Sequence, residues 1–494
     1  MHKKFSIILS FIFLIPALAY AEQGCFSIVA GRLATADGSV LFGHNEDNNP
    51  KFAAGLRKIE RADHDPGEFV LLTGGGRIPQ VKTTWAYWWL QMPELEYSDG
   101  FLNEHGVAVA SDNCPSREDN PELTDGGIGG PILRRLVAER ARTALEGVKL
   151  VGTLIEQFGY TASGRTLIIC DSREGWLVAM VHGKHWVAQR VPDDMVALIA
   201  NTYTIREVDL ADTLNFRGSP DLIDYAVKRG WYNPPEGSFD FEKAYADRKN
   251  RDSIGNTHRQ WSGLRRLSAE PVPIPEDARL PFAVKPKVPL TVRHITGVLR
   301  DHYEDTPYDP ADYGSRPAHK RHTSTICGPY TNSSSVFQLR AGMPVEIGAV
   351  WWLAMWQPCS TPYMPLYAGM LRVPGELCFG GDSGLSCALC ITSPEFGTAY
   401  QTLGDLAKWV NEDYAARIPS LRTRWQEFEQ RSFDLQIPFE RYIRDLWKSQ
   451  PTLAQELLTR YSHGVVADAV HEAHILMLAG TEEKELQSQS SGVR

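Results

Sequence analysis

A cysteine at the head of a hairpin follows an apolar leader at the start of this 494-residue chain. Cys25 opens an apolar run at 26–29 that predicts a buried strand. An Asp-Gly-Ser turn signal at 37–39 precedes a second apolar run at 40–43, and that run ends in His44-Asn45-Glu46-Asp47. The pattern predicts an antiparallel hairpin with Cys25 at one tip.

The first 21 residues have the three parts of a secretory signal peptide. A positive start at 2–4 leads into an apolar stretch at 5–18, and Ala19-Tyr20-Ala21 fits a cleavage site. We therefore expect export to the periplasm or the exterior of the cell, and a short propeptide, residues 22–24, in front of Cys25. No later stretch has the ~18 uninterrupted apolar residues of a membrane span, so no membrane partner is expected once the signal peptide is removed.

A cysteine that becomes the first residue of a chain carries its own α-amino group beside its thiol. That amine has an ordinary pKa of roughly 7.7–8.0, so it can take the thiol proton near neutral pH and act as the general base. Cys25 gains such an amine only if residues 22–24 are also removed. The alternatives are a structural or disulfide-bonded cysteine and a lipid anchor, although Glu22 stands where a lipoprotein signal normally has leucine.

The composition is that of a soluble globular protein, with 43% hydrophobic and 22% charged residues. The formal net charge of −9 argues against nucleic acid or an anionic membrane as the partner. The length allows one large domain or two ordinary ones, and a homo-oligomer is compatible with the sequence.

Seven cysteines remain besides Cys25, so at least one stays unpaired within the chain. In an oxidising compartment, disulfides are favoured over metal ligation. Cys378, Cys387 and Cys390 have a suggestive spacing, but no second C-x-x-C pair follows to complete a zinc site. The sequence therefore predicts no metal.

The middle of the chain alternates between strand and helix signals. A short strand at 107–110 leaves Asn113 just past a strand end, where its amide could donate to a developing oxyanion. Two amphipathic helices are expected from Pro131 and from the capping box that begins at Thr143. Strands are expected next, at 166–170, 176–181 and 195–200. These elements predict sheets covered by helices.

The second half has a polar, loop-rich stretch at 205–325 and then a helical region. Arg259, two residues before Trp261, could clamp a carboxylate, and a surface arginine packed on Trp261 is the alternative. Strands are expected at 333–339 and at 347–356, the latter central because it is almost wholly apolar. From about residue 401 the period predicts four or five helices, with prolines 419, 438 and 451 near their starts.

Five separate segments resemble the dipeptidase A and secernin-like cysteine peptidases, which are N-terminal-nucleophile (Ntn) hydrolases related to penicillin V acylases and bile salt hydrolases. The likeness rests on Cys25, on the turn at 37–39, on His44–Asp47 as a cation-Asn-x-Asp motif, and on the run His185–Asp194 that leads to Asn201. It implies an α+β fold, an αββα sandwich of two antiparallel sheets between helical layers. The domains implied are residues 25–400 for catalysis, 401–480 for a C-terminal helical layer and 481–494 for a flexible tail.

The resemblance also implies site residues. Cys25 matches the nucleophile and base, and Asp47 matches the aspartate that orients the cysteine and its amine. Asn201 matches the asparagine that helps to build the oxyanion hole or holds the amine. Arg259 matches an arginine that closes the site electrostatically, and Asn113 aligns with the oxyanion asparagine of bile salt hydrolases, with Asp112 as the alternative. The motif residues expected to bind substrate are His44 and Asn45.

The function implied is that of an exported, metal-independent cysteine dipeptidase without a cofactor, which acts on small peptides through an acyl-enzyme. An N-acyl amidase of the penicillin V acylase type and a non-catalytic, disulfide-stapled or lipid-anchored binding protein remain open. Relatives usually have Arg or Lys where this chain has His44. Because histidine titrates near neutrality, we expect activity to fall more steeply above pH 7 than in a relative with arginine.

Overall fold

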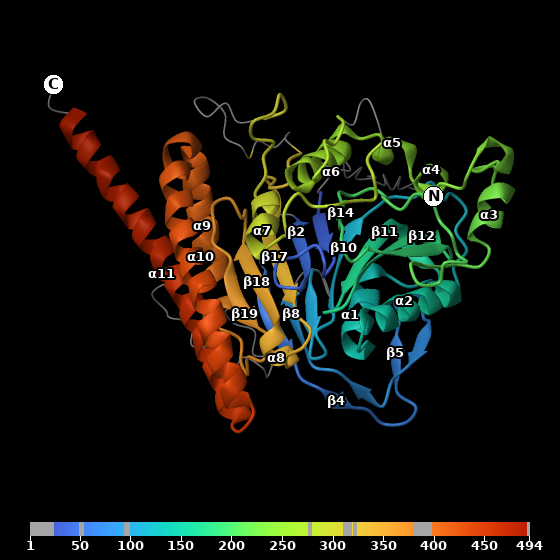
Figure 1. Ribbon diagram of the computed structural model, residues 1–494, viewed down its shortest axis with the longest axis horizontal. Helices are drawn as coiled ribbons and strands as arrows, with labels where there is room; N and C mark the ends of the chain where they lie inside the picture. Colours follow the sequence, from blue (N-terminus) through green and yellow to red (C-terminus); the bar gives the residue numbers. More distant parts are fainter. Residues whose placement is uncertain are drawn as a thin grey trace, which may run out of the picture.

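Two antiparallel sheets pack face to face, with helices on both outer faces (Figure 1). The computed structural model describes residues 24–48, 54–92, 99–274, 279–309, 319, 324–378 and 398–491. This layer order, with a helical region at the C-terminus, confirms the predicted α+β class and αββα sandwich. Among the described residues, no helix combines the length and the apolar character needed to cross a bilayer.

The first sheet has seven strands in the order β16-β14-β1-β2-β17-β18-β19. Every neighbouring pair is antiparallel. Its strands, in chain order, are β1 (Phe26–Ala30), β2 (Val40–Asp47), β14 (Val196–Ile199), β16 (Ala283–Val284), β17 (Thr331–Leu339), β18 (Ala349–Met355) and β19 (Met364–Tyr367).

The second sheet has eight strands in the order β15-β13-β12-β11-β10-β9-β8-β3, again with antiparallel neighbours. Its strands are β3 (Gly55–Ile59), β8 (Tyr87–Gln91), β9 (Phe101–Asn103), β10 (Ala108–Asn113), β11 (Tyr160–Cys170), β12 (Gly175–Gly183), β13 (Trp186–Arg190) and β15 (Phe216–Gly218). Two small ribbons complete the β structure, β4 (Ala62–Asp63) with β7 (Thr83–Thr84) and β5 (Phe69–Leu71) with β6 (Arg77–Pro79).

The predicted hairpin forms the centre of the first sheet. β1 pairs with β2 in the register Phe26↔Asn45 to Ala30↔Leu41. In the turn, the Asp37 carboxylate accepts a hydrogen bond from the backbone N–H of Ser39, and Gly38 has φ 73°, a conformation that favours glycine. The hairpin places Cys25, which immediately precedes β1, at its open end.

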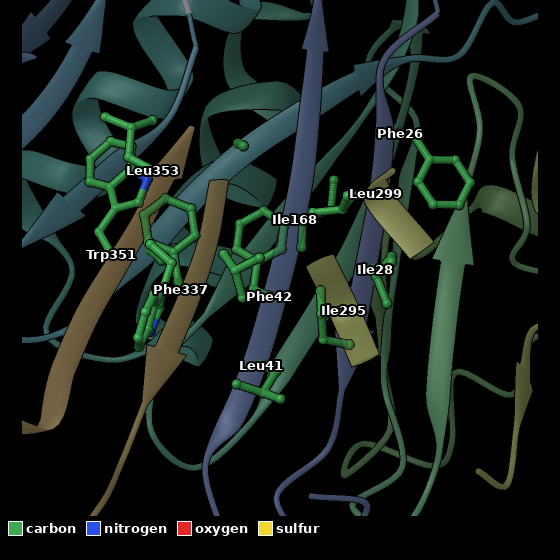
Figure 2. Close-up of a cluster of buried hydrophobic side chains, with 14 of the residues drawn as sticks. Phe26, Ile28, Leu41, Phe42, Ile168, Ile295, Leu299, Phe337, Trp351 and Leu353 are labelled. Carbon is green, nitrogen blue, oxygen red and sulfur yellow. The ribbon is translucent and has the colours of Figure 1, made fainter. Parts of the chain in front are cut away.

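The inner core lies between the sheets, where alternate side chains of each sheet meet. Phe42 stacks on Phe337 with ring centroids 5.3 Å apart, and Phe337 lies 4.7 Å from Trp351 (Figure 2). The strand predicted to be central, β18, lies beside the edge strand β19, while β2 occupies the middle. The apolar character of β18 has another cause, because it is buried on both faces and Trp352 stacks on Phe433 of the C-terminal helices.

Helices cover the outer face of each sheet. The two predicted amphipathic helices, α1 (Gly130–Arg140) and α2 (Ala144–Phe158), pack on the second sheet. On the first sheet lie α6 (Ile254–Leu267) and α7 (Val292–Leu299). Gly43 allows α7 to approach β2 closely, since a Cβ there would lie 2.5 Å from Ile295 Cγ2. The remaining short helices are α3 (Leu222–Lys228), η1 (Pro234–Glu236), α4 (Phe241–Tyr245), α5 (Arg248–Arg251), α8 (Val345–Gly348) and η2 (Gly375–Leu377).

The C-terminal region consists of three helices, α9 (Ala399–Glu412), α10 (Tyr414–Trp447) and α11 (Pro451–Ser491). The prediction of four or five helices was wrong because Pro419 and Pro438 lie inside α10. Each proline removes one backbone hydrogen bond, but buried side chains on both sides of them hold α10 against the sheet. The segment predicted as a flexible tail, from residue 481, is helical as far as Ser491, because α11 continues through a sequence rich in helix formers.

Candidate active site

Four strand ends meet at one end of the sandwich. Because β1 is antiparallel to both β2 and β14, the start of β1 lies beside the ends of those two strands. Cys25 precedes β1, Asp47 ends β2 and Asn201 follows β14. β10 of the facing sheet ends at Asn113, whose backbone carbonyl accepts a hydrogen bond from the Asn201 side chain at 3.1 Å. The fold thus brings together residues that are far apart in the sequence.

The Cys25 thiol lies in a buried, acidic environment. The residue is 7% exposed, and Sγ lies 3.6 Å from Glu46 Oε2, to which it donates a hydrogen bond. Burial raises the pKa of this thiol well above its usual range, and the charges of Glu46, Asp112 and Asp47 raise it further. The thiol is therefore protonated at neutral pH in the uncleaved chain, and a nearby base must accept its proton before it can attack a carbonyl.

Asp47 holds the residue before Cys25. Its carboxylate accepts a hydrogen bond from the backbone N–H of Gly24 and another from Thr331 Oγ1 at 2.6 Å. Burial raises the pKa of Asp47 to about 7, although the Thr331 hydrogen bond and the charge of Arg259 act in the opposite direction. Asp47 therefore contacts the chain at the predicted cleavage site.

Arg259 lies on α6 with its guanidinium against the Gly24–Cys25 peptide. It is 2% exposed; Nη1 donates to the carbonyl oxygen of Gly24, and to that of Cys25 at 2.9 Å. Nη2 donates to the side-chain oxygens of Asn201 and Asn256 at 3.0 and 2.9 Å. The alternative of a surface arginine stacked on Trp261 was wrong, since Arg265 occupies that position.

Asn201 and Asn113, the two predicted oxyanion asparagines, contact the site in different ways, Asn201 through its side chain and Asn113 through its backbone carbonyl. Asn201 has φ 55°, which turns the chain after β14, and its side chain links Arg259 to the carbonyl of Asn113. The Asn113 residue itself is exposed, and the hydrogen bond that ties it to the site uses its backbone carbonyl. Asp112, the alternative to Asn113, is fully buried and accepts a hydrogen bond from Ser27 Oγ at 2.6 Å.

The alternation of side chains along β2 separates His44 from Asn45. Asn45 is fully buried and donates to the carbonyl oxygens of Leu299 and Ile326, both at 2.9 Å. It therefore fixes the loops around α7 and β17, and its predicted contact with substrate stays a prediction. His44 is 1% exposed, and it lies 3.2 Å from Glu46 Oε2, the same oxygen that accepts the hydrogen bond from the Cys25 thiol.

A network of buried charged groups surrounds His44. Its Nδ1 lies 2.8 Å from Ser27 Oγ and 4.0 Å from Asp112 Oδ2, and its Nε2 lies 3.9 Å from Asp99 Oδ1. Burial alone lowers the pKa of His44, but its hydrogen bond to Glu46 and the charges of Asp112, Glu46 and Asp99 outweigh burial, so this pKa is raised. Burial raises the pKa of Asp99 to about 7 and that of Asp112 to about 6.

Glu46 behaves differently from the two aspartates. Burial raises its pKa, but the hydrogen bond and charge of His44 and the charges of Arg134 and Arg165 outweigh burial, so the pKa of Glu46 is lowered. Glu46 is thus an ionised carboxylate at hydrogen-bonding distance from the thiol. In the uncleaved chain it is placed to accept the Cys25 proton.

Sequence reasoning missed several members of this site. Ser27 and Glu46 had a readable signal, because they lie two residues from Cys25 and His44 on predicted strands and therefore share a face with them. Others come from elements distant in the sequence, and no local pattern marks them; these are Asp99, Arg134, Arg165 and Thr331.

Two groups of side chains in the described part of the chain have the donor atoms and the spacing to hold a metal ion. The first, Cys25, His44 and Glu46, consists of the residues described above, whose donor atoms already hydrogen-bond to one another. The second, His302, His319, Cys327 and Cys359, lies outside this site and was not found from the sequence. Cys387 and Cys390 of the cysteine cluster weighed in the sequence lie outside the described residues.

Residues 24–383 match the sequence profile of "Peptidase family C69". The chain belongs to peptidase family C69. This membership confirms the predicted resemblance and makes the chain a hydrolase of peptide bonds, so the non-catalytic alternative is set aside. The C69 match begins one residue before Cys25.

Curated relatives cover most of the chain. A probable dipeptidase from Latilactobacillus sakei is 29% identical over 70% of this chain and 74% of its own length. A dipeptidase from Bifidobacterium longum is 27% identical over 72% of this chain and 73% of its own length. A mutant of the conjugated bile acid hydrolase from Clostridium perfringens is a similar solved structure at 12% identity and a TM-score of 0.29, covering 70% of this chain and 92% of that chain.

Proposed function

We propose that this chain is an exported, metal-independent cysteine dipeptidase whose nucleophile is Cys25, made N-terminal by removal of residues 1–24. Family C69 membership and the relatives named dipeptidase support the activity. The observation that carries the proposal is the way in which Gly24 is held. Arg259 donates to its carbonyl oxygen, while Asp47 accepts its N–H, directly beside the Cys25 thiol.

Self-cleavage would begin with the transfer of the thiol proton to Glu46, 3.6 Å away. Sγ then attacks the Gly24 carbonyl carbon, and the charge that develops on the oxygen is stabilised by Arg259. A C–S bond forms, the C–N bond to Cys25 breaks, and the Cys25 nitrogen takes up a proton. Water hydrolyses the resulting thioester, which frees both the thiol and the α-amine of Cys25.

The mature enzyme would repeat this chemistry on a substrate. The α-amine of Cys25 takes the thiol proton, because its ordinary pKa of about 7.7–8.0 suits that task near neutrality. The thiolate attacks the substrate carbonyl, an acyl-enzyme forms, and the leaving amine departs with a proton. Water then releases the acyl group and restores the thiol.

Gly24 also indicates why the substrate would be a dipeptide. Once the propeptide leaves, the first residue of a substrate can take the place of Gly24, with its carbonyl on Arg259. Its free α-ammonium would then replace the Gly24 N–H on the Asp47 carboxylate. An N-acyl substrate of the penicillin V type would instead place an uncharged acyl chain against that buried carboxylate, which costs free energy because the carboxylate loses a hydrogen-bond partner.

The proposed location is the periplasm or the exterior of the cell, and its support is the signal-peptide pattern of residues 1–21. The proposed partner is a small peptide. With a formal net charge of −9, the protein is not expected to bind nucleic acid.

The test combines N-terminal sequencing with a substrate panel. Wild type, Cys25→Ala and the control Cys170→Ala are purified from the exported fraction and their intact masses measured. Cys170 is a suitable control because it is a free, fully buried thiol on β11, in the facing sheet. Each protein is then assayed with dipeptides, with the same dipeptides N-acetylated, and with penicillin V, in the presence and absence of a chelator.

We expect wild type and Cys170→Ala to begin at Cys25 and to hydrolyse only dipeptides with a free amine, whereas Cys25→Ala keeps residues 22–24 and is inactive. Preference for the acetylated substrates or penicillin V would instead identify an amidase. Full dipeptidase activity in Cys25→Ala would refute the assigned nucleophile. Loss of turnover on chelation with the folded state unchanged would refute metal independence.

A further inference from the structure

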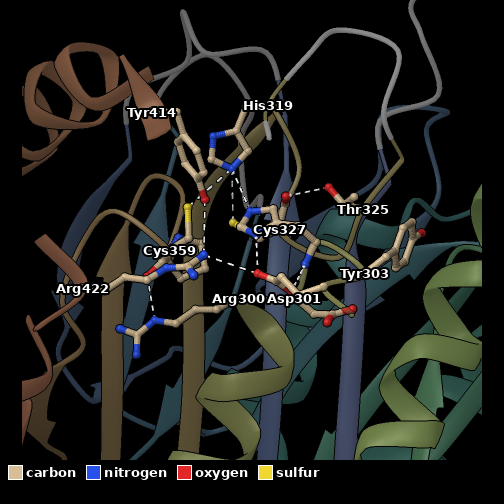
Figure 3. Close-up of polar contacts among 12 residues, drawn as sticks. Arg300, Asp301, Tyr303, His319, Thr325, Cys327, Cys359, Tyr414 and Arg422 are labelled. Atoms are coloured by element: carbon tan, nitrogen blue, oxygen red, sulfur yellow. Dashed lines mark hydrogen bonds and ion pairs between the residues drawn. The ribbon is translucent and has the colours of Figure 1, made fainter. Parts of the chain in front are cut away.

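Four potential metal ligands converge outside the candidate active site. His302 follows α7, Cys327 precedes β17 and Cys359 follows β18, and their side chains meet that of His319 (Figure 3). One donor atom from each lies within 4.8 Å of those of the other three. His302, Cys327 and Cys359 are 1%, 0% and 2% exposed, and both cysteines are free thiols.

The distances match those of a tetrahedral zinc site. With Zn–N near 2.05 Å and Zn–S near 2.3 Å, ligand atoms on one tetrahedral ion are about 3.3 Å apart for two nitrogens and about 3.6 Å for nitrogen and sulfur. The two imidazole Nε2 atoms of His302 and His319 are 3.1 Å apart. His319 Nε2 lies 3.6 Å from Cys327 Sγ and 3.5 Å from Cys359 Sγ.

The hydrogen bonds on the outer side of each imidazole turn both Nε2 atoms toward the interior of the cluster. His302 Nδ1 lies 3.1 Å from the carboxylate oxygen Oε1 of Glu304, and His319 Nδ1 lies 2.8 Å from the amide oxygen Oδ1 of Asn411. Both partners are acceptors, so each Nδ1 carries a ring proton and each Nε2 faces the interior of the cluster. The two Nε2 atoms lie 3.1 Å apart in a hydrogen bond, which a cation bound by both nitrogens would replace.

We propose that His302, His319, Cys327 and Cys359 bind one Zn²⁺ as a structural ion. Two thiolates and two imidazoles in a tetrahedron are a preferred zinc ligand set, and four protein ligands leave no open position for a water or substrate. Binding displaces one proton from each thiol, and the acceptors on Nδ1 orient the rings as outer partners do in metal sites. The ion has a route of entry, because Cys359 and Glu304 line a cavity of about 750 Å³.

The site joins three parts of the fold close to Asp47. The residue after Cys327, Gly328, donates its N–H to Thr331 Oγ1 at 3.0 Å, and Thr331 donates to Asp47 at 2.6 Å. Asn411 belongs to α9, so the His319 imidazole connects the C-terminal helices to the same cluster. Zinc therefore clamps the loops that support Asp47, and its loss is expected to lower the melting temperature.

The test measures zinc bound to the full chain, purified under reducing conditions without a metal-binding tag. Metal content is determined by mass spectrometry for wild type and for His319→Ala, Cys359→Ala, Cys25→Ala and Cys170→Ala. Asn411→Ala is included because it leaves the four ligands intact and removes only the partner of His319 Nδ1. Cobalt is then titrated into the chelated wild-type protein, since cobalt bound to thiolates gives intense charge-transfer absorption.

We expect about one zinc per chain in wild type, Cys25→Ala and Cys170→Ala, and less than about a tenth of that in His319→Ala and Cys359→Ala. Asn411→Ala should bind zinc about 10-fold more weakly, the lower end of the effect of such outer partners. The proposal is overturned if wild type with free thiols binds no zinc when it is supplied, or if zinc survives in both ligand variants. Loss of zinc in Cys25→Ala would show that the ion binds at the candidate active site instead, and would overturn the proposal. A wild-type mass lower by two hydrogens, with Cys327 linked to Cys359, would show a disulfide in place of the ion.

Discussion

Replacing Arg259 with lysine tests the proposed geometry around Cys25 most directly. The guanidinium donates to the carbonyl oxygens of Gly24 and Cys25 through one nitrogen and to Asn201 and Asn256 through another. Lysine keeps the positive charge but has a single ammonium nitrogen, which cannot replace a planar fork. Arg259→Lys therefore removes the oriented donor without removing the charge.

The expected size of the effect follows from the role of that donor. Removal of one oxyanion donor typically costs about 10²–10³-fold in rate, or about 2.7–4 kcal/mol. Cleavage of the Gly24–Cys25 bond should slow by that factor in Arg259→Lys. Gly24→Ala should slow it as well, because a Cβ there would lie 2.6 Å from both terminal guanidinium nitrogens.

The assay follows the intact mass of newly exported protein over time. Arg265→Lys is the matched control, since Arg265 lies on the same helix but packs over Trp261, with its guanidinium carbon 5.2 Å from the ring centroid. Melting temperatures confirm that each variant is folded. If folded Arg259→Lys is processed within about 3-fold of the wild-type rate, well below the loss expected for an oxyanion donor, the guanidinium does not stabilise the oxyanion.

Three further predictions follow from buried groups. His44→Arg should flatten the alkaline side of the pH profile of kcat/KM. The pKa of His44 is raised, so wild type loses the imidazolium charge only as the pH rises past that pKa, whereas arginine keeps its charge. An alkaline side that is unchanged in the variant would contradict this prediction. Burial raises the pKa of Asp112 to about 6, above its unfolded value, so stability is lost as pH rises from about 4 to about 6. Asp112→Asn should not show this loss, so its free energy of unfolding, measured in urea, should rise relative to that of wild type by up to about 3 kcal/mol between pH 4 and 7. If the free energies of unfolding of the two proteins depend on pH in the same way, this prediction is contradicted. Gly43→Ala should destabilise the protein by about 1–3 kcal/mol, because the added Cβ would lie 2.5 Å from Ile295. The control Gly297→Ala, whose Cβ would have no atom within 4 Å, should be neutral or stabilising. Equal unfolding midpoints for the two variants would count against the close approach of α7 to β2.

Local patterns in the sequence predicted the hairpin and the helices that follow it. The alternation of apolar residues, the Asp-Gly-Ser turn and the Thr143 cap act over a few residues, so they can be read without the fold. Asp47, Asn201 and Arg259 came from the resemblance to a family, and the structure brings them to the Gly24–Cys25 peptide. The motif does not state which face of β2 each residue occupies, so it did not predict that the Asn45 amide donates to backbone carbonyl groups.

The prolines of α10 show the limit of local rules, since a proline that would end an isolated helix is tolerated when packing on both sides holds the helix together. The charged groups around the Cys25 thiol show the same limit of local rules for the candidate active site. Asp99, Arg134 and Arg165 reach the neighbourhood of Cys25 only because the two sheets pack face to face.

The sequence by itself determined the class of fold and the peptidase family, because those depend on local periodicity and on a few motif residues. Tertiary structure alone decided the protonation of the site, since burial and distant charges set the pKa values of Cys25, His44 and Asp47. It also decided the four-ligand cluster around His319. Its members have no motif spacing in the chain, and the ends of α7 and of the β17–β18 pair bring them together only when the sheet has formed.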